Sequence, residues 1–488
     1  MALHWQVILG MILGLIVAYV AVLLDGTRLV PVPGEGFTVD SNQLILDYLK
    51  PFGDIFINLL KLIAVPMVLF SIISGVASLK DIKKLGRMGI KTLLLYVATT
   101  MTAVVLGLIL VNLFSPGSKV DQSILTDNRI RYEVWQEKTG VQKLDDICYS
   151  CKPENAEKLA SIQKEMDASP KNKWVEDKLN KKKGSEEKGP LGALVDVVPS
   201  NIFGALTTNS MLQIIFFAIF FGIVGLSLDD DKKKPLFNLI DALNDVFVKM
   251  VWVVMKAMPF FVFALMAGQI VKAAGSDPEK FNELLSFLLQ YSLVVVLGLA
   301  LMIFLVYPSL VAVVIKKLKF RFFLRGMRDA QITAFSTSSS VATLPVTMDC
   351  VNNKLGVSER TSSFVLPIGA TVNMDGTSLY QAIAVVALAQ FHMVDLSFGQ
   401  QAIIVVTATL ASIGAAAVPS AGLVLMIVVL ESVGLNPAWI ALIFPVDRIL
   451  DMCRTVVNVT GDGAVSSIIA NSEGELDPSK STLSSPSA

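Results

Sequence analysis

Long apolar runs recur along the chain at lengths that fit helices crossing a lipid bilayer. A hydrocarbon core about 30 Å thick needs about 20 apolar residues per helix, and Trp5–Leu24 supplies the first run. We expect it to be a retained span and no signal peptide, because no Lys or Arg precedes it and no small-residue cleavage site follows. Seven further runs lie at about Leu49–Leu79, Thr92–Phe114, Leu194–Leu228, Leu236–Ala274, Phe287–Ile315, Thr361–Phe391 and Ala438–Ala470. The pattern predicts eight transmembrane helices.

The composition agrees with a membrane protein. Of the 488 residues, 53% are hydrophobic and 17% are charged. The mean hydropathy is +0.63, well outside the balance of soluble globular domains. We expect the lipid bilayer as the environment of this chain and no nucleic acid partner.

Basic residues gather in the loops that follow the second, fourth and sixth apolar runs. The clusters are Lys80–Lys91, Lys232–Lys234 and Lys316–Arg328. Because loops rich in Lys and Arg stay in the cytoplasm, these loops and both ends of the chain are predicted to be cytoplasmic. The chain is then a multi-pass protein of the plasma (inner) membrane.

One segment, residues 118–189, carries 15 Lys or Arg and 14 Asp or Glu. Its mixed charge and few apolar residues predict a solvated, partly helical and flexible connector outside the cytoplasm. Cys148 and Cys151 form a C-x-x-C inside it, which is compatible with a local disulfide, whereas a zinc site needs two more ligands. Cys350 and Cys453 lie in apolar surroundings and are expected to be unpaired thiols.

The stretch "TAFSTSSSVATLP", Thr333–Pro345, gathers hydroxyl side chains between the sixth and seventh runs. It follows a basic loop and is too short for two full crossings, so it predicts a helical hairpin that enters and leaves on the cytoplasmic side. Backbone at such a tip must be buried in protein or line a wet cavity. The hydroxyls of Ser338, Ser339 and Ser340 are then candidates to meet a polar ligand, the alternative being that they join helices.

The stretch "ASIGAAAVPSAG", Ala411–Gly422, divides the apolar run Gln401–Leu430 into two half-length pieces. This predicts a second hairpin, entered from outside, with a single kinked helix as the alternative. The fold class expected is therefore all-α and multi-pass, with eight transmembrane helices and two re-entrant helical hairpins.

The stretch "GATVNMDGTSLYQA", Gly369–Ala382, places polar groups in the middle of the seventh run. Asn373, Asp375 and Gly376 are expected to break the helix and to hold a carboxylate near the bilayer midplane, where an ionisable group is costly and points to function. Sodium fits such a site, since hard cations prefer carboxylate oxygens and the carbonyls of unwound backbone. The alternative is a buried Asp bonded to neighbouring helices.

The last run contains "VDRILDMCRTVVNVTGD", Val446–Asp462. Steps of three and four place Asp451, Thr455, Asn458 and Asp462 on one helical face, and Arg454 lies one step round from Thr455. This clustering favours a liganded cavity over a structural ion pair.

These residue types suit an acidic amino acid. A guanidinium pairs bidentately with a carboxylate, and an Asp one turn away suits an ammonium group. Arg454 and Asp451 therefore fit the side-chain carboxylate and the amino group of aspartate or glutamate. The main-chain carboxylate of the ligand is left for the serine-rich tip.

"NMDGT", the serine-rich hairpin ending in "TLPVT", and "DMCRTVVNVTGD" together resemble the dicarboxylate/amino acid:cation symporters, which include archaeal aspartate and animal excitatory amino acid transporters. The resemblance covers nearly the whole chain except the charged segment. It implies a sodium-coupled, elevator-type importer of acidic amino acids with inverted repeats and a homotrimeric assembly. It also implies a scaffold (1–88 and 190–276), a transport domain (89–117 and 277–470), the charged insert (118–189) and a polar cytoplasmic tail (471–488).

The resemblance assigns roles to individual positions. Further substrate contacts are implied for Ser340, Thr377, Thr455 and Asn458. One sodium site is implied at Gly369, Asn373, Asn458 and Asp462; a second at Thr371, Ser412, Ile413 and Ala415; and a third at Tyr96, Thr99, Thr100, Asn373 and Asp375.

The chain also departs from the family. Archaeal members carry an extra Arg where this chain has Ser338, and animal members carry it where this chain has Met452. Arg448, one turn earlier, is our hypothesis for its replacement. Gln381 stands where animal members have a Glu linked to proton co-transport, so coupling to sodium alone is expected. Ala417 replaces the usual hinge Gly of the second hairpin.

Four other functions compete with this one. A carrier for C4-dicarboxylates should lack the amino-group Asp, and a carrier for neutral amino acids should lack the Arg, yet Asp451 and Arg454 are both present. An intramembrane aspartyl protease, with Asp375 and Asp462 sharing a proton, lacks its G-x-G-D motif because position 459 is Val. A pure anion channel leaves the sodium-type cluster unexplained.

Overall fold

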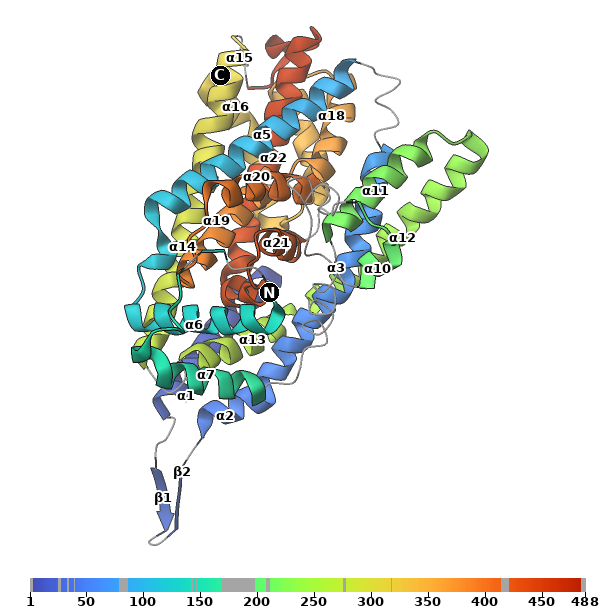
Figure 1. Cartoon of the computed structure of the whole chain (residues 1–488). Helices are drawn as coiled ribbons and strands as arrows, with labels where there is room; N and C mark the ends of the chain where they lie inside the picture. Colours follow the sequence, from blue (N-terminus) through green and yellow to red (C-terminus); the bar gives the residue numbers. More distant parts are fainter. Residues whose placement is uncertain are drawn as a thin grey trace.

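The computed structural model describes residues 3–24, 28–32, 35–38, 40–78, 87–141, 144–145, 147–168, 198–207, 211–274, 278–316, 318–413 and 421–483. Helices make up nearly all of this part of the chain. The one departure from the all-α prediction is an antiparallel hairpin of β1 (Arg28–Val32) and β2 (Glu35–Thr38). It extends from the end of the molecule opposite the C-terminus (Figure 1).

The helices form a body and a lateral arm. In the body, α1 (Leu3–Leu24) packs along α13 (Met258–Ala274). Two glycines permit this close approach, because a Cβ at Gly10 would lie 2.4 Å from the Pro259 carbonyl oxygen and one at Gly14 would lie 2.7 Å from that of Phe263. The arm consists of α11 (Met211–Leu226) and α12 (Asp230–Lys256), which pack on α3 (Lys50–Ser78).

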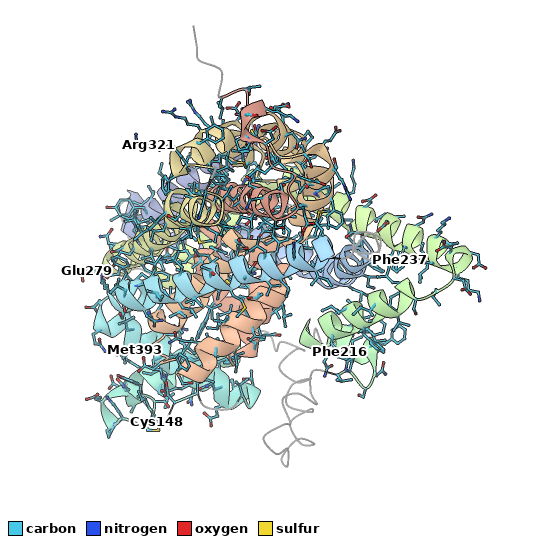
Figure 2. All side chains as sticks on the ribbon, turned by 90° about the horizontal axis from the view of Figure 1, so that it is seen from above. Cys148, Phe216, Phe237, Glu279, Arg321 and Met393 are labelled. Carbon is cyan, nitrogen blue, oxygen red and sulfur yellow. A yellow bond between two sulfur atoms is a disulfide. The ribbon has the colours of Figure 1, made fainter. Side chains whose placement is uncertain are left out.

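Figure 1 shows α11 and α12 projecting to the side away from α14 and α16. The view from above places Phe216 and Phe237 on this arm and Arg321 and Glu279 on the far side of the body (Figure 2). Short helices connect these parts: α2 (Ser41–Leu44) and the π-helical turn Ile45–Leu49 precede α3, and α10 (Ile202–Thr207) precedes α11.

Some predicted spans are single helices and others are divided. The third is α5 (Arg87–Phe114) and the eighth is α22 (Ile440–Ser472). The sixth runs from Pro278 to Val314 through α14 (Pro278–Leu301), the π-helical turn Met302–Val306 (η4) and α15 (Tyr307–Val314). The fifth is divided at Ala257 into α12 and α13. The seventh is divided into α18 (Glu359–Val372) and α19 (Asp375–Phe391), which confirms the predicted break.

Both polar interruptions lie between paired helices. In the first hairpin, α16 (Phe320–Thr337) turns at Ser338 into α17 (Ser340–Asp349), which continues through the π-helical turn Cys350–Lys354. Ser338 has φ 52°, in the left-handed region, and the Ser339 side chain accepts a hydrogen bond from the Ala342 N–H. In the second, α20 (Phe398–Ile413) packs against α21 (Ala421–Ser432), and residues 414–420 lie outside the described residues.

Among the described residues, two continuous helical stretches are each long and apolar enough to cross a membrane by length and composition, Met88–Ser118 and Pro278–Val314. Shorter apolar helices occur at Ile12–Leu24, Phe216–Leu226, Pro259–Gly268 and Phe398–Ser412. The helix α22 lies at the centre of the body, where it contacts α14, α16, α18 and α19. The polar stretches carried by α16, α18 and α19 therefore lie on helices that pack against α22.

The chain beyond α22 folds back onto the base of the first hairpin. The Asp477 N–H donates to the Gly356 carbonyl at 2.8 Å, and the Ser358 N–H donates to the Glu475 carbonyl at 3.0 Å. Gly356 has φ +79° and a Cβ there would lie 2.2 Å from the Asp477 carbonyl oxygen, so this contact requires glycine. The Glu475 carboxylate accepts bonds from Ser358 and Thr361, which lower its pKa. The described residues after α22, 473–483, therefore form an ordered segment, which we call the C-terminal strap.

Over its described residues between 118 and 168 the charged segment is partly helical, as predicted, but it forms a folded unit and not the flexible connector that was also predicted. It contains α6 (Gln122–Thr139) and α7 (Ala156–Ala168). Cys148 and Cys151 form a disulfide, while Cys350 and Cys453 are free. Residues 169–197 lie outside the described residues.

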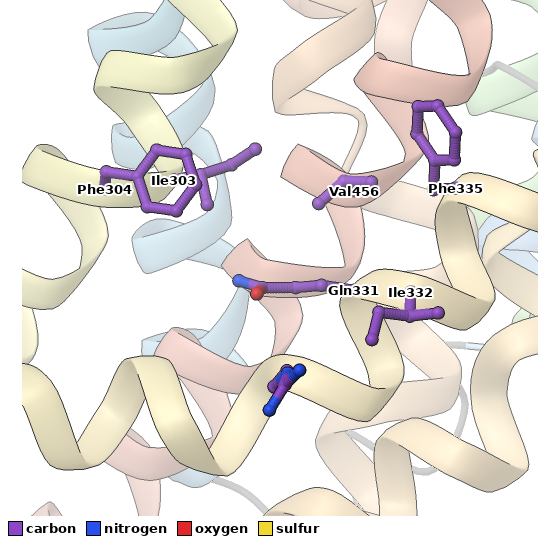
Figure 3. A pocket seen from close by; sticks show the side chains of 7 residues that line it. Ile303, Phe304, Gln331, Ile332, Phe335 and Val456 are labelled. Atoms are coloured by element: carbon purple, nitrogen blue, oxygen red, sulfur yellow. The ribbon is translucent and has the colours of Figure 1, made fainter.

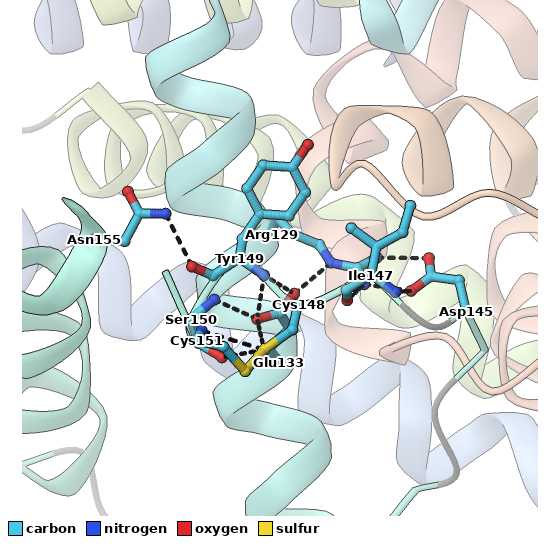
Figure 4. The surroundings of a disulfide bond; sticks show 9 residues. All are labelled: Arg129, Glu133, Asp145, Ile147, Cys148, Tyr149, Ser150, Cys151 and Asn155. Atoms are coloured by element: carbon cyan, nitrogen blue, oxygen red, sulfur yellow. Dashed lines mark hydrogen bonds and ion pairs between the residues drawn. A yellow bond between two sulfur atoms is a disulfide. The ribbon is translucent and has the colours of Figure 1, made fainter. Parts of the chain in front are cut away.

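A buried arginine organises this segment (Figure 4). Arg129 donates to Glu133 at 2.7 Å and pairs with Asp145. Glu133 also accepts N–H bonds from Tyr149 and Ser150 in the disulfide loop. Burial acts to raise the pKa of Glu133, but the Tyr149 N–H and the Arg129 guanidinium outweigh it and hold that pKa below its ordinary value.

The same arginine attaches the segment to the body. Arg129 donates to the Met393 carbonyl at 2.8 Å, Asn128 donates to the Phe391 carbonyl at 3.2 Å, and the Tyr132 hydroxyl donates to the Gly434 carbonyl at 3.1 Å. These three acceptors lie at the end of α19 and just after α21. We call residues 118–168 the cap, because they close this end of the second hairpin.

The Arg129→Met variant should loosen the cap, because it leaves the carboxylates of Glu133 and Asp145 without their guanidinium. Breaking a buried ion pair costs about 3 kcal/mol, which corresponds to about hundredfold faster local opening. Hydrogen exchange of residues 391–394 measures this opening. The control is Lys164→Met, at an exposed position of α7. Equal exchange rates in the two variants would contradict the role of Arg129.

Candidate substrate and cation site

A buried arginine on α22 lies between two aspartates. Arg454 Nη1 lies 2.9 Å from Asp447 Oδ1, and Nη2 lies 2.7 Å from Asp451 Oδ1. The three side chains are almost fully excluded from solvent. Arg454 Nε and Asp447 Oδ2 have no hydrogen-bond partner in the part of the chain that the structure describes. The group therefore keeps an unused donor and an unused acceptor for a ligand.

Two further side chains complete this group. The Arg454 guanidinium lies over the Tyr380 ring, 3.9 Å from its centroid, a stacking that holds a buried cation in place. Arg448 Nη1 lies 3.4 Å from Asp451 Oδ2. Two guanidinium groups thus face two carboxylates, and the group is balanced in charge without a ligand.

The serine-rich turn, residues 338–340, lies at the same height along the axis of α22 as the group around Arg454. Helices α16 and α22 pack together with Gln331 donating to Thr460 at 3.1 Å, and a Cβ at Gly463 would lie 2.5 Å from Met327 Sδ. These contacts set an antiparallel register, which at 1.5 Å per residue brings Ser338 to the height of residues 451–454.

The hydroxyls of the turn are buried. Ser338 Oγ has no hydrogen-bond partner among the described residues. Ser339 caps α17, and Ser340 begins that helix with its side chain buried. The unused Ser338 hydroxyl is therefore available to a polar ligand.

Helix α19 begins against the same stretch of α22. The Gly376 N–H donates to Asn458 Oδ1 at 2.8 Å, and a Cβ at Gly376 would lie 2.4 Å from the Arg454 carbonyl oxygen. Thr377 follows, and a Cβ at Gly422 in the second hairpin would lie 2.4 Å from its Cγ2. The Thr455 hydroxyl donates to the Asp451 carbonyl at 2.9 Å. The break between α18 and α19 therefore lies against α22 beside Arg454. The second hairpin contacts Thr377 next to this break.

A second polar group surrounds Asp375. Its Oδ1 accepts a bond from the Thr100 hydroxyl at 2.5 Å, and its Oδ2 accepts one from the Tyr307 hydroxyl at 2.6 Å. The hydroxyls of Thr99 and Thr100 also lie within reach of the Tyr96 carbonyl, at 3.0 and 2.9 Å. Helix α5 therefore supplies oxygen atoms around the Asp375 carboxylate.

Asp462 joins this group from α22. Its Oδ1 accepts a bond from Asn373 Nδ2 at 2.9 Å. A Cβ at Gly369 would lie 2.3 Å from the Tyr96 hydroxyl and 2.4 Å from Asp462 Oδ1, so only glycine allows Tyr96 and Asp462 to meet there. Asn373 Oδ1 is buried and has no hydrogen-bond partner in the described part of the chain. The residues of the first and third predicted cation sites thus form one neighbourhood.

The charge of this neighbourhood is not balanced by protein side chains. Asp375 is 0% exposed and Asp462 is 2% exposed. No Lys, Arg or His among the described residues is paired with either of them, and their partners are hydroxyl and amide groups. The described residues contain no group of three or more His, Cys, Asp or Glu side chains that could hold a metal ion, so any cation here must be held largely by hydroxyl, amide and carbonyl oxygens. Oxygen ligands and uncompensated negative charge suit a hard cation.

The remaining predicted cation site is not assembled by any contact. The Thr371 side chain is exposed and bonds to carbonyls of its own helix. The buried Ser412 hydroxyl bonds to the Thr409 carbonyl, Ile413 ends α20, and Ala415 lies outside the described residues. Helices α18 and α20 are in contact, but this site stays a prediction.

Three residues of the two groups were absent from the predicted site. Asp447 belongs to the polar stretch Val446–Asp462 that the sequence singled out, but it was given no role in the site, although it stands seven residues before Arg454 on the same helical face. Tyr380 stands five residues after Asp375 in a stretch already singled out, but nothing in the sequence indicates that its ring supports Arg454. Tyr307 lies far away in an apolar run and gives no local signal.

The arrangement agrees with comparisons to known proteins. A sequence profile of the Sodium:dicarboxylate symporter family matches residues 3–472. The chain belongs to this family. It is 37% identical to excitatory amino acid transporter 3 of Oryctolagus cuniculus, over 90% of this chain and 82% of that protein. It is 32% identical to the proton/sodium-glutamate symport protein of Bacillus caldotenax, over 98% and 96%.

An excitatory amino acid transporter of Caenorhabditis elegans is 36% identical over 88% of this chain and 82% of its own length. These matches confirm the resemblance predicted from the sequence motifs. Members of the family are integral membrane transporters. The chain is therefore a symporter and no enzyme, and the protease alternative is excluded.

A Gly369→Ala variant tests the cation neighbourhood. The added methyl overlaps the Tyr96 hydroxyl and Asp462 Oδ1, and overpacking of about 1–3 kcal/mol should raise the sodium concentration needed for binding about tenfold. Sodium binding is followed through the rise in melting temperature that it causes. The control is Gly399→Ala, where a Cβ meets nothing closer than 3.9 Å. The assignment fails if both variants respond to sodium like the unmodified protein.

Proposed function

We propose that the protein imports L-aspartate or L-glutamate across the plasma (inner) membrane together with sodium ions. The substrate occupies the group around Arg454, and sodium occupies the neighbourhood of Asp375 and Asp462. Eight spans and two re-entrant hairpins, with both chain ends in the cytoplasm, complete the proposal.

The observation that carries the proposal is the pair of buried carboxylates without a basic partner. An unpaired charge inside a protein is very costly, and at the depth of a bilayer it marks an ion pathway. Sodium supplies the missing charge and accepts the ligands at hand, which are carboxylate, amide and hydroxyl oxygens. The free Asn373 Oδ1 adds a further oxygen. The relatives include a proton/sodium-glutamate symport protein.

An acidic amino acid fits the unused atoms around Arg454. Its side-chain carboxylate takes the place of an aspartate on the guanidinium, and Arg454 Nε is free to donate. Its ammonium group pairs with Asp451, and its main-chain carboxylate accepts from the Ser338 hydroxyl. Thr377, Thr455 and Asn458 complete the proposed substrate contacts beside Arg454. The relatives named as excitatory amino acid and glutamate transporters support this choice of substrate.

An elevator-type mechanism and a homotrimer belong to the proposal. The scaffold comprises α1, α3 and α11–α13, and the transport domain comprises α5 and α14–α22. The arm supports assembly, because it exposes large apolar side chains: Phe220, Ile223, Leu239, Val246 and Val253 are 53–60% exposed. A surface pocket of about 330 Å³ between α3 and α12 adds to this apolar face. Contact with neighbouring copies would cover it.

The first experiment is uptake of radiolabelled L-aspartate into proteoliposomes, driven by an inward sodium gradient or with choline in place of sodium. We expect uptake only with sodium, inhibited by glutamate and unaffected by succinate or serine. Uptake of equal rate in choline would overturn the cation assignment. Inhibition chiefly by succinate or by serine would instead favour a C4-dicarboxylate or a neutral amino acid carrier.

The Arg454→Gln variant should lose sodium-driven uptake of L-aspartate while still responding to sodium, because it removes the guanidinium and leaves the residues of the cation neighbourhood in place. Sodium-dependent stabilisation against heat reports the second property. Arg325→Gln, at an exposed position of α16, is the matched control. A variant that still transports aspartate with unchanged affinity would show that Arg454 does not bind the side-chain carboxylate.

Arg448 is the proposed replacement for the second arginine of the family. Its contact with Asp451 orients that carboxylate toward the ammonium group of the substrate. An Arg448→Ala variant should bind L-aspartate about tenfold more weakly, as expected for the loss of one contact to a charged group worth about 1.5 kcal/mol. Arg321→Ala on α16 serves for comparison. Unchanged affinity in Arg448→Ala would count against this role.

A further inference from the structure

A pocket of about 290 Å³ lies on the outer side of the first hairpin, away from the substrate group. Figure 3 shows Ile303 and Phe304 on one side of it and Ile332, Phe335 and Val456 on the other. Its walls come from η4, α16 and α22. Gln331 and Arg328 supply its polar side chains.

The pocket opens onto an apolar surface. Phe304 is 58% exposed, Ile332 is 59% exposed and Phe335 is 44% exposed. The helical stretch that carries Phe304 has further exposed apolar side chains, namely Leu293, Leu297, Leu305, Val313 and Val314. In the membrane this surface faces acyl chains, so an apolar chain can enter the pocket without crossing water.

Arg328 does not fit an apolar wall. It lies eight residues from the start of α16, about 12 Å along the helix, and its side chain is exposed. The neighbouring carboxylate, Asp329, is engaged by Lys354. A guanidinium at the edge of hydrocarbon is costly unless an anion meets it, and its long stem can reach toward the headgroups.

More positive charge lies at the same end of the hairpin. Lys316, Lys319, Arg321 and Arg325 are all exposed. A basic cluster beside a membrane helix on the cytoplasmic side attracts anionic lipid. The pocket therefore combines an apolar wall for a chain with a cation at its edge and a positive potential at its mouth.

We propose that this pocket binds an anionic phospholipid, with the phosphate on Arg328 and one acyl chain against Phe304, Ile332 and Phe335. The inference rests on the proposed membrane orientation, in which the base of α16 is cytoplasmic. The lipid fills the space between η4 and the first hairpin.

The proposed lipid also contacts α22, on the face opposite the proposed substrate contacts. Val456 and Thr460 share a face of α22 opposite the one that carries Asp451, Thr455 and Asn458. Val456 lines the pocket, and Thr460 holds Gln331 of the pocket wall. A bound lipid therefore supports the packing of α16 on α22, which sets the height of the serine turn beside Arg454.

The test uses the purified full-length protein in lipid nanodiscs and two photoactivatable lipids with the label on the acyl chain, phosphatidylglycerol and phosphatidylcholine. We expect phosphatidylglycerol to label peptides of η4 and α16 about fivefold more than phosphatidylcholine does, as one basic contact contributes about that factor. Arg328→Gln should remove this preference, and Lys234→Gln, at an exposed position of α12 on the lateral arm, should retain it. Equal labelling by the two lipids, or a preference unchanged in Arg328→Gln, would overturn the proposal.

A second variant separates the apolar contact from the charge. In Ile332→Trp the larger side chain fills the pocket and keeps Arg328, so labelling of η4 should fall for both lipids. Undiminished labelling would show that the chain lies elsewhere. Labelling is independent of transport, so its result stands even if the protein carries a different substrate, and failure of uptake with intact labelling would point to the proposed function alone.

Discussion

Charge in an apolar interior must be matched, and this requirement governs the centre of the molecule. Helix α22 carries Arg448 and Arg454 beside Asp447 and Asp451, and this group is balanced. About two turns beyond Arg454, Asp462 lies in the same neighbourhood as Asp375, and both have only hydroxyl and amide partners among the described residues. If an acidic amino acid binds at the first group, as we propose, it adds negative charge close to the second. Cations therefore become more favourable when substrate is present, and substrate becomes more favourable when cations are present, which is the reciprocity that symport requires.

The fold converges on α22 because several helices are interrupted where they meet it. The break between α18 and α19 brings the Gly376 N–H to Asn458, and the turn at Ser338 lies level with Arg454. Glycines at positions 369 and 376 leave no room for a side chain. The cap and the C-terminal strap hold the two hairpins from opposite ends, through the Gly434 and Gly356 carbonyls. Interrupted helices place backbone groups at the site, and surrounding contacts keep those groups from facing lipid.

Much of this was predictable from local patterns. Apolar length gave the main helices within a few residues at most ends, and the polar stretch around Asp375 correctly predicted a break. The spacing of Asp451, Thr455, Asn458 and Asp462 placed them on one face of α22. What the sequence did not reveal depends on contacts between distant segments: Tyr307 meeting Asp375, Tyr380 stacking on Arg454, and the cap, whose high charge concealed the buried Arg129 network. A high fraction of charged residues predicts that a segment is solvated as a whole. A single buried arginine with its partners can nevertheless order a polar segment.

Substrate and sodium are proposed to share one charge balance, and we would test this first by calorimetric titration of L-aspartate at several sodium concentrations. The affinity for L-aspartate should rise with sodium concentration more steeply than in direct proportion. More than one cation is needed to balance the carboxylates of Asp375 and Asp462 together with the charge of the substrate. An affinity for L-aspartate that does not change when choline replaces sodium would contradict it.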